Sequence, residues 1–392
     1  MPLDYLNPLI LFVVLALLAL GYYLLPNRWR WVWLLLCSYL FYFWVGSWSI
    51  LILLLSTALN YGLGLGLGRD FKKGKKALLI SGILRNLLLL FFFKYFNSLL
   101  ASSSLVTQFL QSTGGRLLVP VGLSFFTLQN ISYLVDVYKG IQPAEKHAGI
   151  FALYTSFFPK VLAGPIERAK SLLPQLHNPA GYNKQNVFEA IPLILFGLFK
   201  KVVIADRLAL YVDKLFNEVG RNQGAPVWYG LVFLSFQIYL DFSGYTDLAL
   251  GAARLLGIKL TPNFKRPYLS ENIVEFWNRW HLSFSTWLRD YIFYPLRRNL
   301  VQFTGKSTGF LALVIPPLIT MLASGIWHGT GWTFVFWGLY HAVFYIGVVL
   351  VRSRQGSGTQ KPAWLRWTGI FLNFIVITIG WILFRSASLS EA

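Results

Sequence analysis

The sequence predicts an all-α polytopic membrane protein that forms a single embedded domain over residues 1–392. Of its residues, 56% are hydrophobic and only 13% are charged, a balance too apolar for a domain with a solvated surface. Several apolar runs reach the roughly 20 residues that a helix needs to cross a bilayer. Because no long polar stretch separates these runs, the sequence excludes a chain of separate soluble domains.

About nine apolar segments have the length of a membrane-spanning helix. They cover residues 6–25, 31–46, 48–67, 77–96, 187–205, 228–242, 310–327, 332–351 and 368–384. Three shorter apolar pieces, at 117–135, 150–163 and 245–257, contain Pro120, Pro159 and several glycines. We expect these pieces to be re-entrant or interfacial, because irregular backbone at membrane depth is tolerated only inside protein or beside a water-filled cavity.

Lysine and arginine outnumber aspartate and glutamate by 35 to 15, which gives a formal charge of +20. No basic residue occurs in residues 1–8, whereas basic residues follow the first and third predicted spans at Arg28, Arg30, Arg69, Lys72, Lys73, Lys75 and Lys76. Since basic loops stay on the cytoplasmic side, we expect the N-terminus to face outside. The positive charge then suits anionic membrane lipids, and we expect no nucleic-acid partner.

Several chemistries are excluded or weakened by the residues that the chain lacks. The single cysteine, Cys37, lies inside an apolar run and excludes intrachain disulfides and multi-cysteine metal sites. No HExxH or DxD pattern occurs, so we predict no bound metal. The glycines at 62, 64, 66 and 68 do not fit the spacing of a phosphate-binding loop, and we expect them to permit close helix packing.

His328 is the strongest candidate for a catalytic residue. It lies in Ser324-Gly-Ile-Trp-His-Gly-Thr-Gly-Trp332, between two predicted spans, and glycines on both sides permit a bend or the approach of a substrate. Imidazole, with an ordinary pKa of about 6.5, can take a proton from a hydroxyl at neutral pH. We therefore predict that His328 is a catalytic base and that Trp327 beside it binds substrate.

A second histidine, His281, lies in the aromatic-rich segment 271–290, which we expect to form one continuous helix near the membrane interface. On a helical projection one face carries Phe276, Trp277, Trp280, Phe284, Trp287 and Tyr291. The opposite, polar face carries Asn278, His281, Leu282, Ser285 and Arg289 and is expected to face a wet space. We predict that His281 is catalytic and that Asn278, Trp277, Trp280 and Ser285 bind substrate. The alternative is that His281 and Asn278 only hydrogen-bond across helices.

Two carboxylates, Asp241 and Asp247, lie beside apolar stretches and need partners at membrane depth. Arg254, Lys265 and Arg266 follow them in the sequence. The carboxylates then either hold the helices together through these cations or line a substrate path, and we count Asp241 among the substrate-binding candidates.

The three remaining histidines have simpler interpretations. His147 and His177 lie in polar loops and are expected to be solvated. His341 is expected to be a core histidine that faces another helix.

Five motifs occur together and in order along the chain. They are Pro120-Val-Gly-Leu-Ser-Phe-Phe-Thr-Leu-Gln, Phe157-Phe-Pro-Lys-Val-Leu-Ala-Gly-Pro-Ile-Glu-Arg, Asp241-Phe-Ser-Gly-Tyr-Thr-Asp, Phe276-Trp-Asn-Arg-Trp-His-Leu-Ser and Gly325-Ile-Trp-His-Gly-Thr-Gly-Trp. With this set the chain resembles the membrane-bound O-acyltransferases (MBOAT), and most closely their bacterial alginate O-acetyltransferase branch.

The resemblance implies a ring of roughly nine to eleven transmembrane and re-entrant helices around a central cavity. It implies that His328 is the catalytic histidine and that Asn278 and His281 line the same chamber, where Asn278 or protonated His281 would stabilise an oxyanion. It also implies a cytoplasmic thioester donor, acetyl-CoA or an acyl-carrier thioester, with no bound cofactor. The acceptor would be an exported polysaccharide such as alginate, reached through a periplasmic or extracellular acetyltransferase partner of this inner-membrane protein.

Two other functions stay open at this point. The related D-alanyl transfer to teichoic acid shares the two-histidine layout, and a transporter of lipid-linked glycans would also place polar residues on broken helices. Because relatives in the alginate branch usually continue beyond the segment at 381–385, we expect either a fragment with a truncated C-terminus or a short variant of the family.

Overall fold

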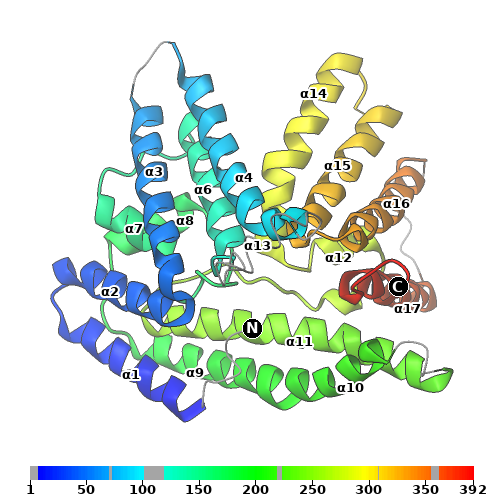
Figure 1. Ribbon diagram of the computed structural model, residues 1–392, viewed down its shortest axis with the longest axis horizontal. Helices are drawn as coiled ribbons and strands as arrows, with labels where there is room; N and C mark the ends of the chain where they lie inside the picture. Colours follow the sequence, from blue (N-terminus) through cyan, green and yellow to red (C-terminus); the bar gives the residue numbers. More distant parts are fainter. Residues whose placement is uncertain (1–7, 70–72, 101–118, 219–222, 308, 355–361) are drawn as a thin grey trace. The chain divides into compact units, whose positions relative to one another are not determined.

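The computed structural model describes residues 8–69, 73–100, 119–218, 223–307, 309–354 and 362–392 (Figure 1). All regular secondary structure in these ranges is helical, which confirms the predicted all-α class for the part of the chain they cover. Residues 6, 7, 117 and 118, at the start of two predicted segments, lie outside the described ranges.

The chain forms two compact units. The first consists of Met1–Phe196 and Tyr245–Thr261, and the second of Gly197–Gly244 and Pro262–Ala392. One 31-residue helix, α11 (Ala225–Leu255), contributes residues to both units.

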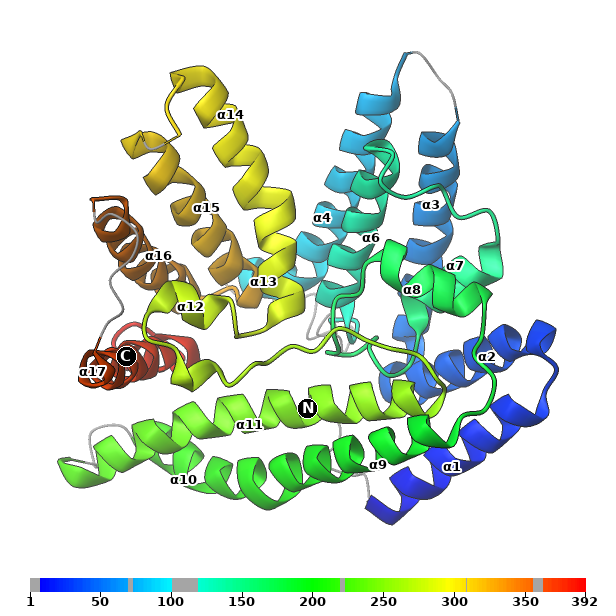
Figure 2. The ribbon, with the colours of Figure 1, turned by 180° about the vertical axis from the view of Figure 1, so that it is seen from behind.

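The first unit is built mainly from apolar helices. They are α1 (Pro8–Leu24), α2 (Asn27–Gly46), a short 3-10 turn (Ser47–Ser49), α3 (Ile50–Gly68), α4 (Lys75–Leu100), α6 (Leu123–Tyr138), α7 (Ala148–Ser156), α8 (Ala169–His177) and α9 (Lys184–Leu198). In both views α3, α4 and α6 run side by side (Figures 1 and 2). A Cβ at Gly64 would lie 2.5 Å from the Tyr133 ring, and one at Gly68 would lie 2.5 Å from Ala144 Cβ. The predicted role in close helix packing is therefore confirmed at Gly64, which faces Tyr133 of α6, but not at Gly62, where a Cβ would meet nothing within 4 Å.

The second unit contains both leading histidine candidates. Its elements are a π-helical turn η3 (Phe199–Ala205), α10 (Asp206–Asn217), the first part of α11, η4 (Pro267–Leu269), α12 (Ile273–Trp277), α13 (Leu282–Leu288), a second π-helical turn η5 (Arg289–Phe293), α14 (Tyr294–Thr304), α15 (Phe310–His328), α16 (Trp332–Arg354) and α17 (Ala363–Arg385). Its core is mainly aromatic, with Phe276, Trp280, Trp337 and Trp381 all buried. Figures 1 and 2 show α14 and α15 running side by side.

Five segments of the described chain are long and apolar enough to cross a membrane. They are Asn27–Gly68, Lys75–Phe96, Phe310–His328, Trp332–Ser353 and Ala363–Arg385, with Leu9–Leu24 as a shorter apolar helix. The chain is therefore a multi-pass membrane protein. The predicted spans at 187–205 and 228–242 form helices that are not among these segments, and they carry Lys200, Lys201 and Asp241, which lower their hydropathy.

The prediction of a separate broken piece at 245–257 is wrong, because residues 225–255 form one uninterrupted helix. Its glycines serve close packing instead of breaking the helix. A Cβ at Gly251 would lie 2.6 Å from Ile194 Cγ1, and one at Gly244 would lie 2.9 Å from the Gly197 carbonyl oxygen. Periodicity alone does not distinguish these two uses of glycine.

The motif that begins at Phe157 forms a buried polar cluster in the first unit. The Lys160 ammonium is buried and donates to Gln129 Oε1 at 2.5 Å. Burial lowers the pKa of Lys160 to about 7, although Glu167 opposes this shift. Glu167 is buried as well and accepts from the backbone N–H and the hydroxyl of Thr261. These contacts join the motif to α6 and to the segment after α11.

Candidate active site

α15 ends on His328, as the sequence predicts. The Gly329 N–H makes the last helical hydrogen bond, to the Gly325 carbonyl at 3.3 Å, and the backbone then becomes extended. The glycines around this end permit the close approach of α15 and α16. A Cβ at Gly325 would lie 2.2 Å from the Phe334 carbonyl oxygen, and one at Gly329 would lie 2.0 Å from the Phe334 ring. These glycines thus fix the position of His328 against α16.

Replacement of Gly325 by alanine is expected to separate α15 from α16, because the new Cβ would overlap backbone that cannot rotate away. We expect a loss of about 1–3 kcal/mol in stability, the usual cost of overpacking. Thermal unfolding of the purified protein measures this loss. The matched control is Gly62→Ala, because a Cβ at Gly62 meets nothing within 4 Å. Equal unfolding temperatures for the two variants would contradict the packing argument.

The His328 ring is half-buried and is surrounded by aromatic rings from four helices. Ring centroids lie 4.8 Å away for Trp327, 5.7 Å for Phe284 of α13, 5.2 Å for Trp337 of α16 and 5.1 Å for Phe384 of α17. Rings packed on several sides restrict the orientation of the imidazole. At the same time its partial exposure leaves it accessible.

His281 is only 2% exposed and breaks the helix that the sequence predicts over 271–290. Its backbone has φ 44° and ψ 53°, a left-handed conformation that costs a residue with a Cβ about 1–2 kcal/mol. The segment therefore consists of α12, a turn, α13 and η5, and the prediction of one continuous helix is wrong. The predicted exposure of His281 on a wet face is also wrong, whereas five of the six predicted aromatic residues are buried.

Asn263, a fully buried residue, stabilises this break from a distant part of the sequence. Its carbonyl accepts from Leu282 N at 2.9 Å, and its side-chain oxygen accepts from Ser283 N at 3.1 Å. The same Oδ1 lies 3.4 Å from His281 Nδ1. Because the backbone N–H of Ser283 donates to this oxygen, the contact favours the tautomer of His281 that carries its hydrogen on Nδ1. The lone pair of a neutral His281 then resides on Nε2.

Burial lowers the pKa of His281 to about 3. The residue lies outside the five membrane-crossing segments. At neutral pH it is therefore an uncharged imidazole, which argues against the expectation that protonated His281 stabilises an oxyanion. Its chemistry fits a hydrogen-bond acceptor at Nε2 instead.

The low pKa of His281 predicts a specific pH dependence of stability. Below the ordinary pKa of about 6.5 the unfolded chain binds a proton that the folded chain excludes, so stability falls as the pH falls from about 6.5 towards 3. One such group contributes about 1.4 kcal/mol per pH unit. We expect His281→Asn, which tolerates the left-handed backbone, to flatten the pH dependence of the unfolding temperature between pH 6.5 and 5. An unchanged pH dependence would contradict a buried neutral histidine.

The two histidines meet at one pair of aromatic rings. Phe284 and Trp327 stack with centroids 4.3 Å apart and an interplanar angle of 29°. His281 lies 5.1 Å from Phe284 and 6.3 Å from Trp327, while His328 lies 5.7 Å and 4.8 Å from the same two rings. The second unit thus brings together His281, Trp327 and His328, three of the residues predicted from the sequence.

The other candidates of the same segment are placed differently. Trp277 packs on Trp337, which also contacts His328, with centroids 5.7 Å apart. Trp280 lies deeper in the aromatic core, 5.3 Å from Phe276. The Ser285 hydroxyl donates to the Trp280 carbonyl at 2.9 Å and so serves the turn itself. Asn278 is exposed at the end of α12, and none of the histidine contacts given above involves it.

Asp241 forms a salt bridge with Lys201, with Oδ1 and Nζ 2.9 Å apart, and the same ammonium lies 2.7 Å from Asp206 Oδ1. Lys201 was not among the expected partners, and Arg254, which was, pairs with Glu189. The salt bridge joins α11 to the π-helical turn η3. It favours the interpretation in which Asp241 holds helices together.

Replacement of Asp241 by asparagine is expected to lower stability by about 1–3 kcal/mol, because Lys201 loses a charged acceptor. Turnover per folded molecule should stay at the wild-type value. Asp213→Asn is the matched control, since Asp213 forms a more exposed salt bridge with Arg385 and should contribute about 0–1 kcal/mol. Lost turnover in a fully folded Asp241→Asn protein would assign Asp241 to the substrate path.

Three residues near the histidines have no strong sequence signal. Asn263 precedes the aromatic segment and belongs to none of the five motifs. Trp337 lies in an apolar predicted span, where a tryptophan is expected to be a core residue. His341 is buried and faces α17, as expected, with Nε2 only 2.8 Å from a Cβ built at Gly380. Both His341 ring nitrogens lack a hydrogen-bond partner within the described part of the chain. Ring contacts with Trp277 and Trp337 connect His341 to the site.

Comparison with known proteins agrees with the motifs. The family pattern described as MBOAT, membrane-bound O-acyltransferase family, matches residues 147–390, which include His281 and His328. The probable alginate O-acetylase AlgI of Pseudomonas syringae pv. tomato is 35% identical over 329 residues, which cover 82% of this chain and 60% of that protein. The AlgI protein of Azotobacter vinelandii is 36% identical over 314 residues, with 79% and 60% coverage.

A relative that is named for another acceptor, peptidoglycan, has a similar level of identity. The peptidoglycan O-acetyltransferase of Helicobacter pylori is 34% identical over 349 residues, which cover 81% of this chain and 63% of that protein. The chain thus spans about 60% of the length of the curated relatives it matches. Since the family pattern matches more than half of the chain and three relatives are 34–36% identical over about four fifths of it, the chain belongs to the membrane-bound O-acyltransferase family.

Proposed function

We propose that this protein is an O-acyltransferase that moves acetyl groups from a thioester towards the hydroxyl groups of an exported polysaccharide such as alginate, with His328 as the catalytic base. The convergence of His281 and His328 on the Phe284–Trp327 pair is the observation that carries this proposal. His281 is three residues from Phe284 and His328 follows Trp327, so the stacking of these two rings brings segments far apart in the sequence together.

The proposed reaction is an ordinary acyl transfer. A nitrogen of His328 accepts the proton of the attacking hydroxyl. At the same time the hydroxyl oxygen forms a bond to the carbonyl carbon of the thioester. The carbon–sulfur bond then breaks, and the sulfur leaves as a thiol after taking the proton from His328. The aromatic rings around His328 hold the imidazole in one orientation and exclude part of the water that would otherwise compete as the acceptor.

His281 acts in this proposal as a neutral acceptor. With its hydrogen on Nδ1 towards Asn263, Nε2 can accept a hydrogen bond and orient the attacking hydroxyl. Asn278 is the proposed oxyanion donor, since its amide is uncharged and exposed. Trp327 and Trp277 are the proposed walls for the acyl group, and Trp280 supports them from the aromatic core.

The proposed donor, membrane location and partner are those that the resemblance to the family implies. The donor would be acetyl-CoA or an acyl-carrier thioester on the cytoplasmic side, where the basic loops suit its phosphates. The helices would surround a central cavity in the inner cell membrane, and a periplasmic or extracellular acetyltransferase would complete the transfer. The names of the three relatives described above all refer to O-acetylation, which supports acetyl over D-alanyl as the group transferred.

The choice between these acyl groups is testable with purified protein in lipid nanodiscs. Radiolabelled acetyl-CoA, an acetylated carrier protein and a D-alanylated carrier protein are supplied separately, with oligomannuronate as the hydroxyl acceptor. We expect acetyl esters on the oligosaccharide from one of the two acetyl donors. Transfer from the D-alanyl carrier alone would overturn the acetyl assignment. No transfer from any donor, both without and with a periplasmic extract that supplies the acetyltransferase partner, would overturn the proposed activity.

A further inference from the structure

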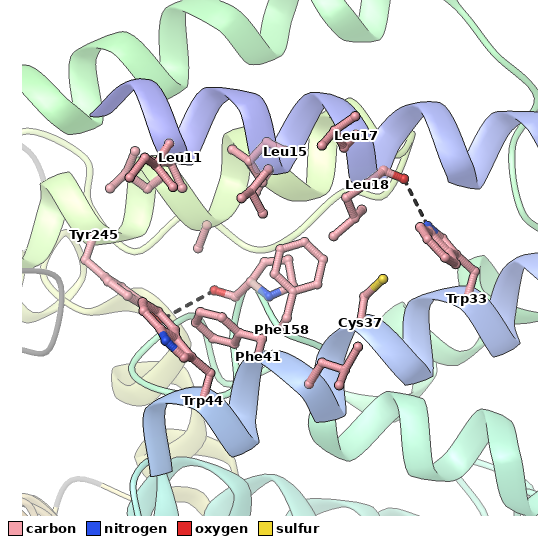
Figure 3. Close-up of a pocket in the computed structure, with 17 residues that line it drawn as sticks. Leu11, Leu15, Leu17, Leu18, Trp33, Cys37, Phe41, Trp44, Phe158 and Tyr245 are labelled. Carbon is pink, nitrogen blue, oxygen red and sulfur yellow. Dashed lines mark hydrogen bonds between the residues drawn. The ribbon is translucent and has the colours of Figure 1, made fainter. Parts of the chain in front are cut away.

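An apolar groove of about 620 Å³ lies in the first unit, beside α1 and α2 (Figure 3). Side chains of both helices line it, together with the turn at Phe158 and Pro159 and one face of α11 from Tyr245 to Ala252. Its size falls within the roughly 300–1,000 Å³ of ordinary ligand pockets. The groove contains none of the residues of the candidate active site.

The groove has a buried floor and an exposed rim. Leu15 of α1 and Tyr245 of α11 are buried at the floor, whereas Leu17 of α1 and Leu40 and Trp44 of α2 are largely exposed. All five side chains are apolar or aromatic. The groove therefore opens onto the apolar outer surface of the two helices, where a membrane protein meets lipid tails.

Two polar groups on the wall, those of Trp33 and Tyr245, are already used within the protein. Trp33 Nε1 donates to the Leu18 carbonyl at 3.0 Å, and the Tyr245 hydroxyl lies 3.5 Å from the Pro159 carbonyl, as the dashed lines in Figure 3 show. Neither donor is left for a sugar, a nucleotide or a lipid headgroup. An apolar cavity without polar partners also does not hold ordered water.

We propose that this groove binds one hydrocarbon chain of a membrane phospholipid. α2 belongs to the segment Asn27–Gly68, which is long and apolar enough to cross the bilayer, so that lipid tails surround the rim. Lipid tails are as apolar as leucine, and they fill an apolar groove without the loss of any hydrogen bond. The site extends beyond the proposed acyl transfer and does not depend on it.

The single cysteine of the chain provides a direct test. Cys37 lines the groove, and its sulfur points into the space between α1 and α2 (Figure 3). Purified protein is reconstituted in nanodiscs with a phospholipid that carries a diazirine midway along one chain. After irradiation, mass spectrometry maps the crosslinked residues. We expect crosslinks on the groove-lining residues of α1 and α2, and we expect Cys37→Trp to lower their yield about tenfold.

Leu36→Trp is the matched control, since Leu36 is the exposed neighbour of Cys37 on α2 and does not line the groove. It should leave the crosslinks unchanged. If Cys37→Trp fails to fold, Val14→Trp fills the groove from α1, with Leu20→Trp as its control.

Two outcomes would overturn the lipid site: equal yields in the filling and control variants, or crosslinks spread evenly over exposed residues of α4. Acyl transfer is measured on the same samples. A labelled groove in a protein without transfer activity would overturn only the proposed function, and an active protein with an unlabelled groove would overturn only the lipid site.

Discussion

Replacement of His328 by alanine is expected to abolish acyl transfer while the protein stays folded and inserted. General acid–base catalysis contributes about 10²- to 10⁴-fold, and the variant should lose at least this factor. His328 is half-buried at the end of α15, so that its removal creates only a partial cavity. The measurement is the content of ester-linked acyl groups on the exported polymer, divided by the amount of folded protein in the membrane.

His177→Ala is the control for this experiment. His177 is a partly exposed histidine of the first unit that pairs with Glu145, and its loss should leave transfer unchanged. His328→Gln is a second inactive variant, because glutamine forms hydrogen bonds but does not accept a proton at neutral pH. It should lose acyl transfer as His328→Ala does. Full acylation in the His328→Ala cells would remove this residue from the mechanism.

Replacement of His281 by asparagine should lower turnover by about a hundredfold, the lower end of the range for acid–base catalysis. Asparagine adopts the left-handed backbone of this position more readily than most residues, so the turn between α12 and α13 should survive. What the variant loses is the Nε2 acceptor. Initial rates of acyl transfer and thermal unfolding, measured on the same preparation, separate this loss from a loss of fold.

Asn263→Ala distinguishes positioning from direct action. It removes the side-chain oxygen that holds His281 Nδ1 and Ser283 N, while His281 itself stays in the chain. We expect lower turnover and lower stability together in Asn263→Ala, but mainly lower turnover in His281→Asn. If His281→Asn lost only thermal stability, with turnover per folded molecule intact, His281 would be a structural residue.

The sequence predicts best where a pattern is local. The end of α15 at His328 follows from a predicted span over 310–327 and the glycines that come after it, and the buried aromatic residues of 276–287 follow from helical periodicity. The five motifs predict the family that the comparison with known proteins shows.

Prediction fails where a distant residue decides the local structure. The helix over 271–290 has an unbroken helical pattern, yet Asn263 satisfies the backbone N–H groups of Leu282 and Ser283 and stabilises a left-handed His281. The partner of Asp241 is likewise a lysine forty residues earlier, on a π-helical turn that no periodicity predicts. Glycines around His328 look like access points in the sequence, but Gly325 and Gly329 serve the close contact of α15 and α16.

The central claim is that His328 activates a hydroxyl for attack on a thioester. The most direct test is the release of free thiol from acetyl-CoA or an acetylated carrier by the purified protein, measured with and without an oligosaccharide acceptor. The account predicts acceptor-dependent thiol release by the wild type and by His177→Ala, and none above background by His328→Ala. Acceptor-dependent release at the wild-type rate by His328→Ala would contradict it.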